Sequence, residues 1–363
     1  MAAALPLCSD QAWNVSDVLD AMAPTLSTSE HSRRAASASY AAAPPFPHAV
    51  ADGVFPACLL RAVAQELPQS IDKQGCARGA SRCFNGGARE LHKSQIVSER
   101  AMGGATRLLF ATLRAPPFVR WLEQLTGIAK LRPDPGYSGS GVHITAPGGR
   151  LGVHADFNHL PLKPSWHRRV NTFVYLNDEW PEAYGGHLEL WDRNLTACAT
   201  RVLPTMGRFV AFSTTDFSFH GHPVPLAAPL GRARRSVALY YYTVGVRPPA
   251  ECLKGRCSSM HTTIFKSTPL CSPTANAAPS LPSGNEAPSK RKRGKASQHH
   301  MENPSGKPSL PSRLSWERIR GGRTTRGERH LPHPCLAQKQ PAVMTPKTLT
   351  RRKRVLELCS RPM

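Results

Sequence analysis

His154 and Asp156 lie two positions apart in the segment Gly152–Asn158 and could hold a metal ion together. We predict that this segment is a β-strand, in which side chains two positions apart point to the same face. The imidazole and the carboxylate would then project into one cavity, with Ala155 turned away. A second histidine would complete a set of two histidines and one carboxylate, which favours non-haem Fe(II) and oxygen chemistry.

Other polar residues along the chain could complete such a site. Either His220 or His222 could be the third ligand, since both lie in the segment Phe212–Pro223. If His222 is not a ligand, it could orient one or face a substrate. Three residues closer to the motif could act in the same way: His143, Asn158 and His159.

The elements that must position these residues are short strands, separated by Gly, Pro, Asn or Asp. The predicted strands are Gly141–Ala146, Gly152–Phe157, Val170–Leu176, His187–Trp191, Arg208–Ser213 and Ser236–Val244. Helical spacing precedes them in Ala57–Leu67, Ala105–Leu113 and Pro117–Leu125, and Gly127 ends the last helix. Helices followed by strands predict an α+β, mainly β fold, in which N-terminal helices brace a barrel or sandwich.

The composition predicts a folded domain between two disordered tails. Residues 1–45 are rich in Ala and Ser and carry little pattern beyond a short helix around Val15–Met22. The folded domain is predicted to span residues 46–249. Residues 250–363 contain Pro, Ser, Lys and Arg with few large apolar side chains, which cannot offset the entropy of ordering the chain. We expect this basic tail to contribute nothing to the chemistry.

The net charge of +23, most of it in the tail, could attract nucleic acid or another acidic partner. The basic runs Lys290–Arg293 and Arg351–Arg354 favour the nucleus over the cytoplasm as the location. The ten cysteines form no CxxC pair, which predicts reduced thiols in an intracellular protein. No apolar window is long enough to span a membrane, so we expect no membrane partner. The sequence leaves the oligomeric state open.

Together these segments resemble the Fe(II)- and 2-oxoglutarate-dependent oxygenases of the prolyl 4-hydroxylase-like group. The resemblance extends from about Phe46 to Val246 and implies a double-stranded β-helix, or jelly roll, with the metal site in its open end. The segments that carry it are Pro45–His48, Pro117–Leu122, Gly152–Asn158, Tyr175–Asn177, Gly185–Trp191, Phe212–Pro223 and Arg234–Tyr242.

The resemblance also implies roles for single residues. His154, Asp156 and a distal histidine would be the iron ligands. In the family that histidine follows an aromatic residue and precedes glycine, which favours His220 over His222.

Two residues would hold the cosubstrate. Arg235 would bind the distal carboxylate of 2-oxoglutarate through its planar fork, with Arg232 and Arg234 as close alternatives. Tyr175 would contact the same carboxylate.

The implied cofactors are Fe(II), 2-oxoglutarate as cosubstrate and O2, with ascorbate as a candidate reductant. The implied reaction couples decarboxylation of 2-oxoglutarate to hydroxylation of an aliphatic C–H bond, for which a prolyl residue of a protein is the leading substrate. The alternatives are a free small molecule or a sugar-linked substrate, a nucleic-acid demethylase, and an inactive barrel that serves as a binding module.

Overall fold

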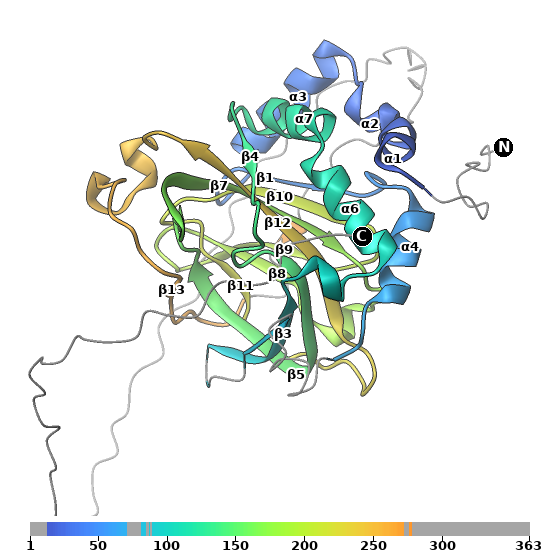
Figure 1. Ribbon diagram of the computed structural model, residues 1–363. Helices are drawn as coiled ribbons and strands as arrows, with labels where there is room; N and C mark the ends of the chain where they lie inside the picture. The colour runs from blue at the N-terminus through green and yellow to red at the C-terminus, as the bar shows by residue number, and fades with distance from the viewer. Residues whose placement is uncertain (1–12, 71–80, 85–86, 88, 272–275, 278–363) are drawn as a thin grey trace, which may run out of the picture. The chain divides into compact units, whose positions relative to one another are not determined.

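The computed structural model describes residues 13–70, 81–84, 87, 89–271 and 276–277, all within the compact unit Met1–Lys292 (Figure 1). The helices are α1 (Val15–Ala21), α2 (Ala23–Leu26), α3 (Glu30–Ala42), α4 (Ala57–Glu66), α6 (Gly104–Arg114) and α7 (Pro116–Thr126), with short 3-10 turns η2 (Glu99–Ala101), η3 (Glu182–Tyr184), η4 (Pro249–Glu251) and η5 (Leu253–Gly255). The strands are β1 (His48–Ala51), β2 (Ser81–Phe84), β3 (Glu90–Ile96), β4 (Arg132–Pro133), β5 (Gly141–Ala155), β6 (His159–Leu160), β7 (Lys163–Tyr175), β8 (Leu188–Trp191), β9 (Cys198–Val202), β10 (Phe209–Ser213), β11 (His220–His222), β12 (Arg234–Val244), β13 (Ile264–Phe265) and β14 (Asn276–Ala277).

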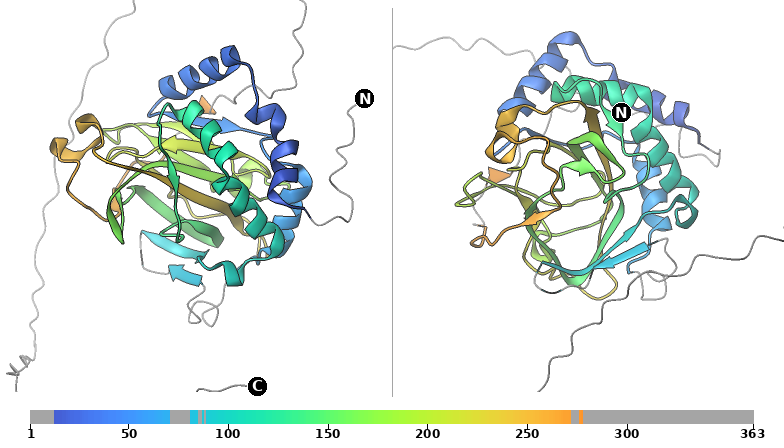
Figure 2. Two further views of the ribbon diagram at one scale, coloured as in Figure 1. Left: turned by 45° about the horizontal axis from the view of Figure 1, so that its top comes forward. Right: turned by 60° about the vertical axis from the view of Figure 1, so that its left-hand side comes forward.

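The described strands form one rolled sheet in the order β1-β10-β7-β12-β5-β11-β8-β9-β14, with β2, β3, β4, β6 and β13 beside this path. Every described pairing is antiparallel except that of β14 with β9. The right-hand view of Figure 2 looks along the roll, with the strands curving around its interior and the α-helices on one side. The predicted jelly roll is confirmed. The two strands predicted at its centre are a single strand, β5, which bends around Gly148.

Alternation along β12 separates the two faces of the sheet. Val237, Leu239 and Tyr241 share a buried cluster with residues of α6 and α7, so they form the helix-facing side. Ala238 and Tyr240 belong to a second cluster inside the roll. The helices therefore brace one face and leave the other to line the interior.

The N-terminal segment is more ordered than its composition predicts. The helix expected around Val15–Met22 is confirmed as α1, but α2 and α3 follow it. Val18, Met22 and Tyr40 are buried in the helix-facing core, and the Tyr40 hydroxyl lies 2.8 Å from Ser213 Oγ. The prediction of disorder is therefore wrong for residues 13–45, because a few well-spaced apolar side chains anchor helices in which small and polar residues predominate. Residues 1–12 lie outside the described part.

The folded region also extends beyond the predicted boundary at residue 249. Strand β13 pairs with the end of β5, and the Lys266 amide donates to the Val153 carbonyl at 2.8 Å. Residues 250–271 are thus part of the folded unit, and for them the prediction of a disordered tail is wrong. The basic runs Lys290–Arg293 and Arg351–Arg354 lie outside the described residues. No described helix is both long and apolar enough to cross a membrane.

Two disulfides explain part of this order. Cys252 pairs with Cys257 directly after the roll, and Cys198 of β9 pairs with Cys271. The prediction of reduced thiols is wrong for these four cysteines. The spacing of Cys198 and Cys271 gave no sign of pairing, because they lie 73 positions apart and only the fold brings them together.

Candidate metal centre and its pocket

Two strands bring the predicted ligands together at one end of the roll. His154 of β5 and His220 of β11 are direct partners across the sheet, and Asp156 follows the last residue of β5. The carboxylate lies between the rings, with Oδ1 at 3.5 Å from His154 Nε2 and Oδ2 at 3.5 Å from His220 Nε2. Among the described residues, these three donors are all within 4.8 Å of one another.

The hydrogen bonds of the two histidines fix which nitrogen faces the carboxylate. His154 Nδ1 donates to the Gly152 carbonyl at 2.8 Å, and His220 Nδ1 donates to the Ser218 carbonyl at 2.9 Å. Each Nε2 therefore presents a lone pair toward Asp156. Two lone pairs and a carboxylate that converge on one point lack a positive charge between them, so this donor set fits a divalent ion such as Fe(II).

The site keeps Asp156 ionised and His220 neutral. Burial opposes ionisation of the carboxyl, but Arg168 and the two histidines outweigh it and hold the pKa of Asp156 well below its usual value. Burial, with the nearby His154, lowers the pKa of His220 to about 4. Both groups are therefore in their metal-binding form at neutral pH.

Two neighbours hold the carboxylate in place. Asn171 Nδ2 donates to Asp156 Oδ2 at 2.7 Å, and Arg168 NH2 lies 3.0 Å from the same oxygen. Arg168 is only 1% exposed, and its guanidinium lies over the Tyr240 ring, 3.4 Å from the centroid. Its NH2 is paired with Asp156, whereas its buried NH1 has no acceptor at hydrogen-bond geometry among the described residues. The pocket therefore contains a buried donor beside the metal centre that an acceptor could use.

The triad opens into a cavity of about 700 Å³. The cavity is lined by β3, β5, β7, β11 and β12, the turn between β6 and β7, and the segment around β13. Its aromatic walls include Phe84, Phe157, Phe173, Tyr175, Tyr240 and Phe265.

Of the two neighbouring arginines at the start of β12, Arg234 lines this cavity and Arg235 lies on the other side of the strand. Arg234 is buried, donates from Nε to the Gly186 carbonyl at 2.7 Å and from NH2 to Tyr175 Oη at 3.1 Å. No carboxylate of the described residues forms an ion pair with it. A buried, unpaired guanidinium is costly, so this side chain calls for an anionic ligand.

Arg235 instead ties helix α4 to the sheet. Its NH1 donates to the carbonyls of Ala64 and Leu67 at 2.8 and 3.2 Å, and its NH2 donates to the Leu176 carbonyl at 3.2 Å. It does not line the cavity. The assignment of Arg235 as the pocket cation is therefore wrong by one position, because neighbouring residues of a strand point to opposite faces.

The remaining predicted residues divide between the cavity wall and its mouth. Tyr175, His143 and His222 line the cavity, and burial lowers the pKa of both histidines. His222 is thus near the triad without belonging to it.

Gly221, between His220 and His222, has no room for a side chain, because a Cβ there would lie 2.9 Å from the carbonyl oxygens of Leu151 and Gly152.

Asn158 binds a neighbouring segment of the chain, whereas His159 lines the cavity. The side chain of Asn158 donates to the Ser259 carbonyl at 2.8 Å and accepts from the His261 amide at 2.9 Å. His159 lines the cavity and hydrogen-bonds Asn158 through Nδ1 at 2.8 Å. Asn158 therefore holds a segment that the sequence assigned to the tail.

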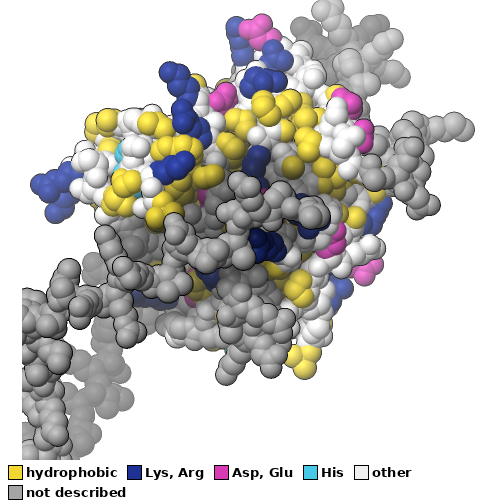
Figure 3. Space-filling view, viewed as in Figure 1, with side chains coloured by type: hydrophobic (Ala, Val, Ile, Leu, Met, Phe, Trp, Pro, Cys, Tyr) yellow, Lys and Arg dark blue, Asp and Glu magenta, His cyan; other side chains and the backbone are white. Residues whose placement is uncertain are grey.

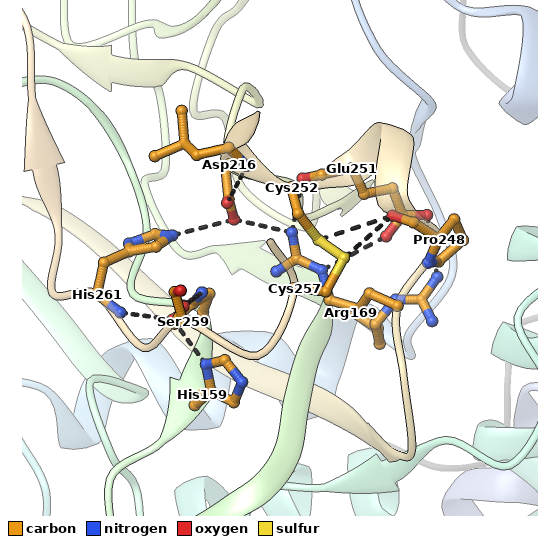
Figure 4. Close-up of a disulfide and its surroundings, with 12 residues drawn as sticks. His159, Arg169, Asp216, Pro248, Glu251, Cys252, Cys257, Ser259 and His261 are labelled. Atoms are coloured by element: carbon orange, nitrogen blue, oxygen red, sulfur yellow. Dashed lines mark hydrogen bonds and ion pairs between the residues drawn. A yellow bond between two sulfur atoms is a disulfide. The ribbon is translucent and has the colours of Figure 1, made fainter. Parts of the chain in front are cut away.

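That segment, residues 252–266, is named here the C-terminal strap. Buried Asp216 holds it through the Leu253 amide at 2.7 Å and His261 Nε2 at 3.0 Å, while Arg247 pairs with the same carboxylate at 2.8 Å. Figure 4 shows Asp216 pointing toward His261, with the Cys252–Cys257 disulfide beside them.

The strap forms one wall of the cavity. Its residues Met260, His261, Thr262, Thr263 and Phe265 line the cavity, and the Phe265 ring packs 5.3 Å from that of His154. Sequence reasoning missed these residues and Arg168. The sequence offered only a faint signal for the strap, in the pair Cys252 and Cys257.

We predict that a chain ending at Pro249 loses stability as well as this wall. It would lack both described disulfides, and closing a loop of 73 residues contributes about 4 kcal/mol in the chain-entropy description. The melting temperature should fall by roughly 10 °C, measured by calorimetry. A chain ending at Ala277 is the matched control and should melt like the full chain. Equal melting of both truncated chains would contradict the structural role of the strap.

Comparisons with known proteins agree with this geometry. Residues 140–242 match the model of the family described as the 2OG-Fe(II) oxygenase superfamily. This segment contains the triad, Tyr175 and Arg234, so the resemblance seen in the sequence is confirmed. A search of curated proteins found no match.

Several solved structures are similar to this chain at low identity. A prolyl 4-hydroxylase of Pseudomonas putida is 18% identical, with 59% of this chain and 100% of that chain covered at a TM-score of 0.41. A prolyl hydroxylase of Trichoplax adhaerens, solved with a hypoxia inducible factor peptide fragment, is 15% identical. The match covers 59% of this chain and 91% of that chain at a TM-score of 0.41. The epimerase SnoN, solved with Fe3+, alpha ketoglutarate and nogalamycin RO, is 15% identical. The match covers 59% of this chain and 84% of that chain at a TM-score of 0.40.

Proposed function

We propose, from the match to the 2OG-Fe(II) oxygenase superfamily, that this chain is an Fe(II)- and 2-oxoglutarate-dependent hydroxylase of a prolyl residue in a protein. The observation that carries the proposal is the pairing of two features in one cavity. Two histidines and a carboxylate converge in it, and none of the described carboxylates pairs with the buried cation Arg234 in its wall.

The three converging side chains would hold the metal. His154, Asp156 and His220 offer two neutral nitrogens and one anionic oxygen, and the hydrogen bonds on each Nδ1 keep the rings oriented. When bound, Fe(II) supplies the oxygen activation and C–H cleavage that no side chain of the pocket can perform.

Arg234 and Tyr175 would hold 2-oxoglutarate in the same cavity. The guanidinium is fixed by the Gly186 carbonyl and by Tyr175 Oη, so it would meet the distal carboxylate without reorganising. Its charge would also offset the cost of taking that carboxylate out of water.

Arg168 would serve the substrate. Arg168 lines the cavity, and its NH2 and Nε are taken by Asp156 and Asn171. Its NH1 has no acceptor among the described residues, so a substrate carbonyl is a suitable acceptor for it. Peptides carry such carbonyls at every residue, which supports a protein substrate over a simple hydrocarbon. Small-molecule and sugar-linked substrates remain the alternatives, and ascorbate is proposed as a reductant that sustains turnover.

An inactive binding module is a weaker candidate, because such a module would not need the complete triad together with an unpaired cation. A nucleic-acid substrate has less support, since the basic runs Lys290–Arg293 and Arg351–Arg354 that suggested it follow the domain with the triad in the sequence and are not part of it. Location remains a proposal as well. The basic runs favour the nucleus, whereas disulfides such as Cys252–Cys257 are more typical of an oxidising compartment.

The test is succinate formation from 2-oxoglutarate with a panel of proline-containing peptides and free amino acids, read together with the mass of each candidate substrate. We expect succinate in step with the gain of one oxygen on a proline of a peptide. The His154→Ala variant is the control for metal-dependent turnover. Oxidation of only the free amino acids, or no succinate with any of them, would contradict the proposal.

A further inference from the structure

Two large apolar side chains at the mouth of the cavity remain exposed to water. Leu162, in the turn between β6 and β7, is 92% exposed, and Met260 of the strap is 52% exposed. Both also line the cavity, so they stand where its wall meets solvent. Hydrophobic side chains gather with Lys and Arg at the upper left of the view in Figure 3. Exposed apolar side chains at the entrance of a site mark contacts that a ligand can bury.

The fold holds Met260 rigidly while leaving its side chain uncovered. Asn158 binds the backbone on both sides of it, at the Ser259 carbonyl and the His261 amide. Asp216 holds the strap at Leu253 and His261, and the Cys252–Cys257 disulfide constrains its first residues. Asn158 lies two residues after Asp156, so the loop that follows the ligand strand also sets the position of the mouth. A preorganised contact of this kind costs little entropy on binding.

The charges around the cavity restrict which partner fits. The lining contains more cations than carboxylates: Arg82, Lys93, Arg168 and Arg234 against Glu90 and Asp156. A basic segment would be repelled there, and Arg234 is needed for the cosubstrate under the proposed function. The mouth itself offers apolar contact at Leu162 and Met260.

We propose that Leu162 and Met260 dock an extended peptide whose residue next to the modified one carries a large apolar side chain. This rests on the proposed function, because a residue that reaches the metal centre must bring its neighbours to the mouth. The apolar neighbour is buried against the two side chains while the modified residue enters the cavity. The two residues thus determine specificity and take no part in the chemistry.

The test measures binding and not turnover. Fluorescent peptides are titrated into the protein loaded with Mn(II) and 2-oxoglutarate, and binding is followed by anisotropy. The central residue is Pro or Ala, and the flanking residue is Leu, Gly, Glu or Lys. We expect Leu-flanked peptides to bind about tenfold tighter than Gly-flanked ones, the gain from burying one large apolar side chain. Lys-flanked peptides should bind most weakly.

The variants Leu162→Lys and Met260→Lys should lose most of this advantage and prefer the Glu-flanked peptide. The matched control is Leu230→Lys, since Leu230 is 94% exposed and does not line the cavity. It should keep the ranking of the unmodified protein. All three positions are exposed, so the folded state should be preserved, which thermal melting checks.

The outcomes separate the docking inference from the proposed function. An unchanged ranking in Leu162→Lys and Met260→Lys, or no binding of any peptide, overturns the docking surface. A flank preference that these variants change supports it, even if Pro and Ala peptides bind alike. If the succinate assay of the proposed function then shows no oxidation of any proline peptide, the docking inference stands and the proposal of a prolyl substrate fails.

Discussion

Replacing His220 by alanine is expected to reduce succinate formation below detection and to remove the stabilisation that the metal gives. His220 Nε2 faces Asp156 across from His154, so its loss leaves two donors where three converge. A divalent ion that binds only the folded protein at a hundred times its dissociation constant stabilises it by about 2.7 kcal/mol. The unmodified protein should therefore melt higher when Fe(II) or Mn(II) is added under argon, whereas His220→Ala should not respond.

His222→Ala is the matched control for this prediction. His222 is also buried and lines the same cavity, but it is outside the triad. Its substitution should leave the metal-induced rise in melting temperature in place. A variant His220→Ala that still responds to metal, beside an unresponsive His222→Ala, would move the third ligand to His222.

Replacing Arg234 by glutamine should raise the KM for 2-oxoglutarate about a hundredfold or more. The expected loss is about 3 kcal/mol, in the range found when one partner of a buried charge pair is removed. Glutamine can keep a hydrogen bond in the cavity but cannot neutralise a carboxylate. The measurement is succinate production at varied 2-oxoglutarate, with kcat and KM reported separately.

Arg235→Gln should show the opposite pattern. Its guanidinium holds the carbonyls of Ala64, Leu67 and Leu176, so its loss should lower the melting temperature and leave the KM for 2-oxoglutarate unchanged. A raised KM in Arg235→Gln, together with a normal KM in Arg234→Gln, would return the cosubstrate role to Arg235.

The local part of the site could be predicted from the sequence because it depends on strand alternation alone. His154 and Asp156 are two positions apart on an extended chain, so their side chains point the same way however the strands pair. The helices with clear apolar faces could also be predicted, because the spacing of their apolar residues is a local pattern as well. Phe118, Trp121, Leu122 and Leu125 are all buried in α7, as their spacing indicates.

The choice between Arg234 and Arg235 could not be made in this way. Both faces of β12 are buried, so the pattern of apolar residues does not reveal which face looks into the cavity. The choice is set by the pairing of Arg234 with Thr145 of β5 and by helix α4, which covers the other side. Both are contacts between residues far apart in the chain.

The strap was missed because it is held by interactions that composition does not report. Its order comes from a buried carboxylate, Asp216, an amide, Asn158, and two disulfides, and not from an apolar core of its own. A low content of large apolar residues predicts disorder only when such anchors are absent. Asp216, Asn158 and Cys198 lie far from the strap in the sequence, so these contacts exist only in the folded chain.

The bridge between Cys198 and Cys271 makes the chain from one to the other a closed covalent ring. The ring carries His220, Arg234 and the whole strap, whereas His154 and Asp156 lie on the open chain before it. A protease that cuts once inside the ring would therefore release no fragment until a reductant opens it. Gel mobility with and without reductant would then separate cuts within the ring from cuts elsewhere, so that exposure of the strap could be followed in the intact protein.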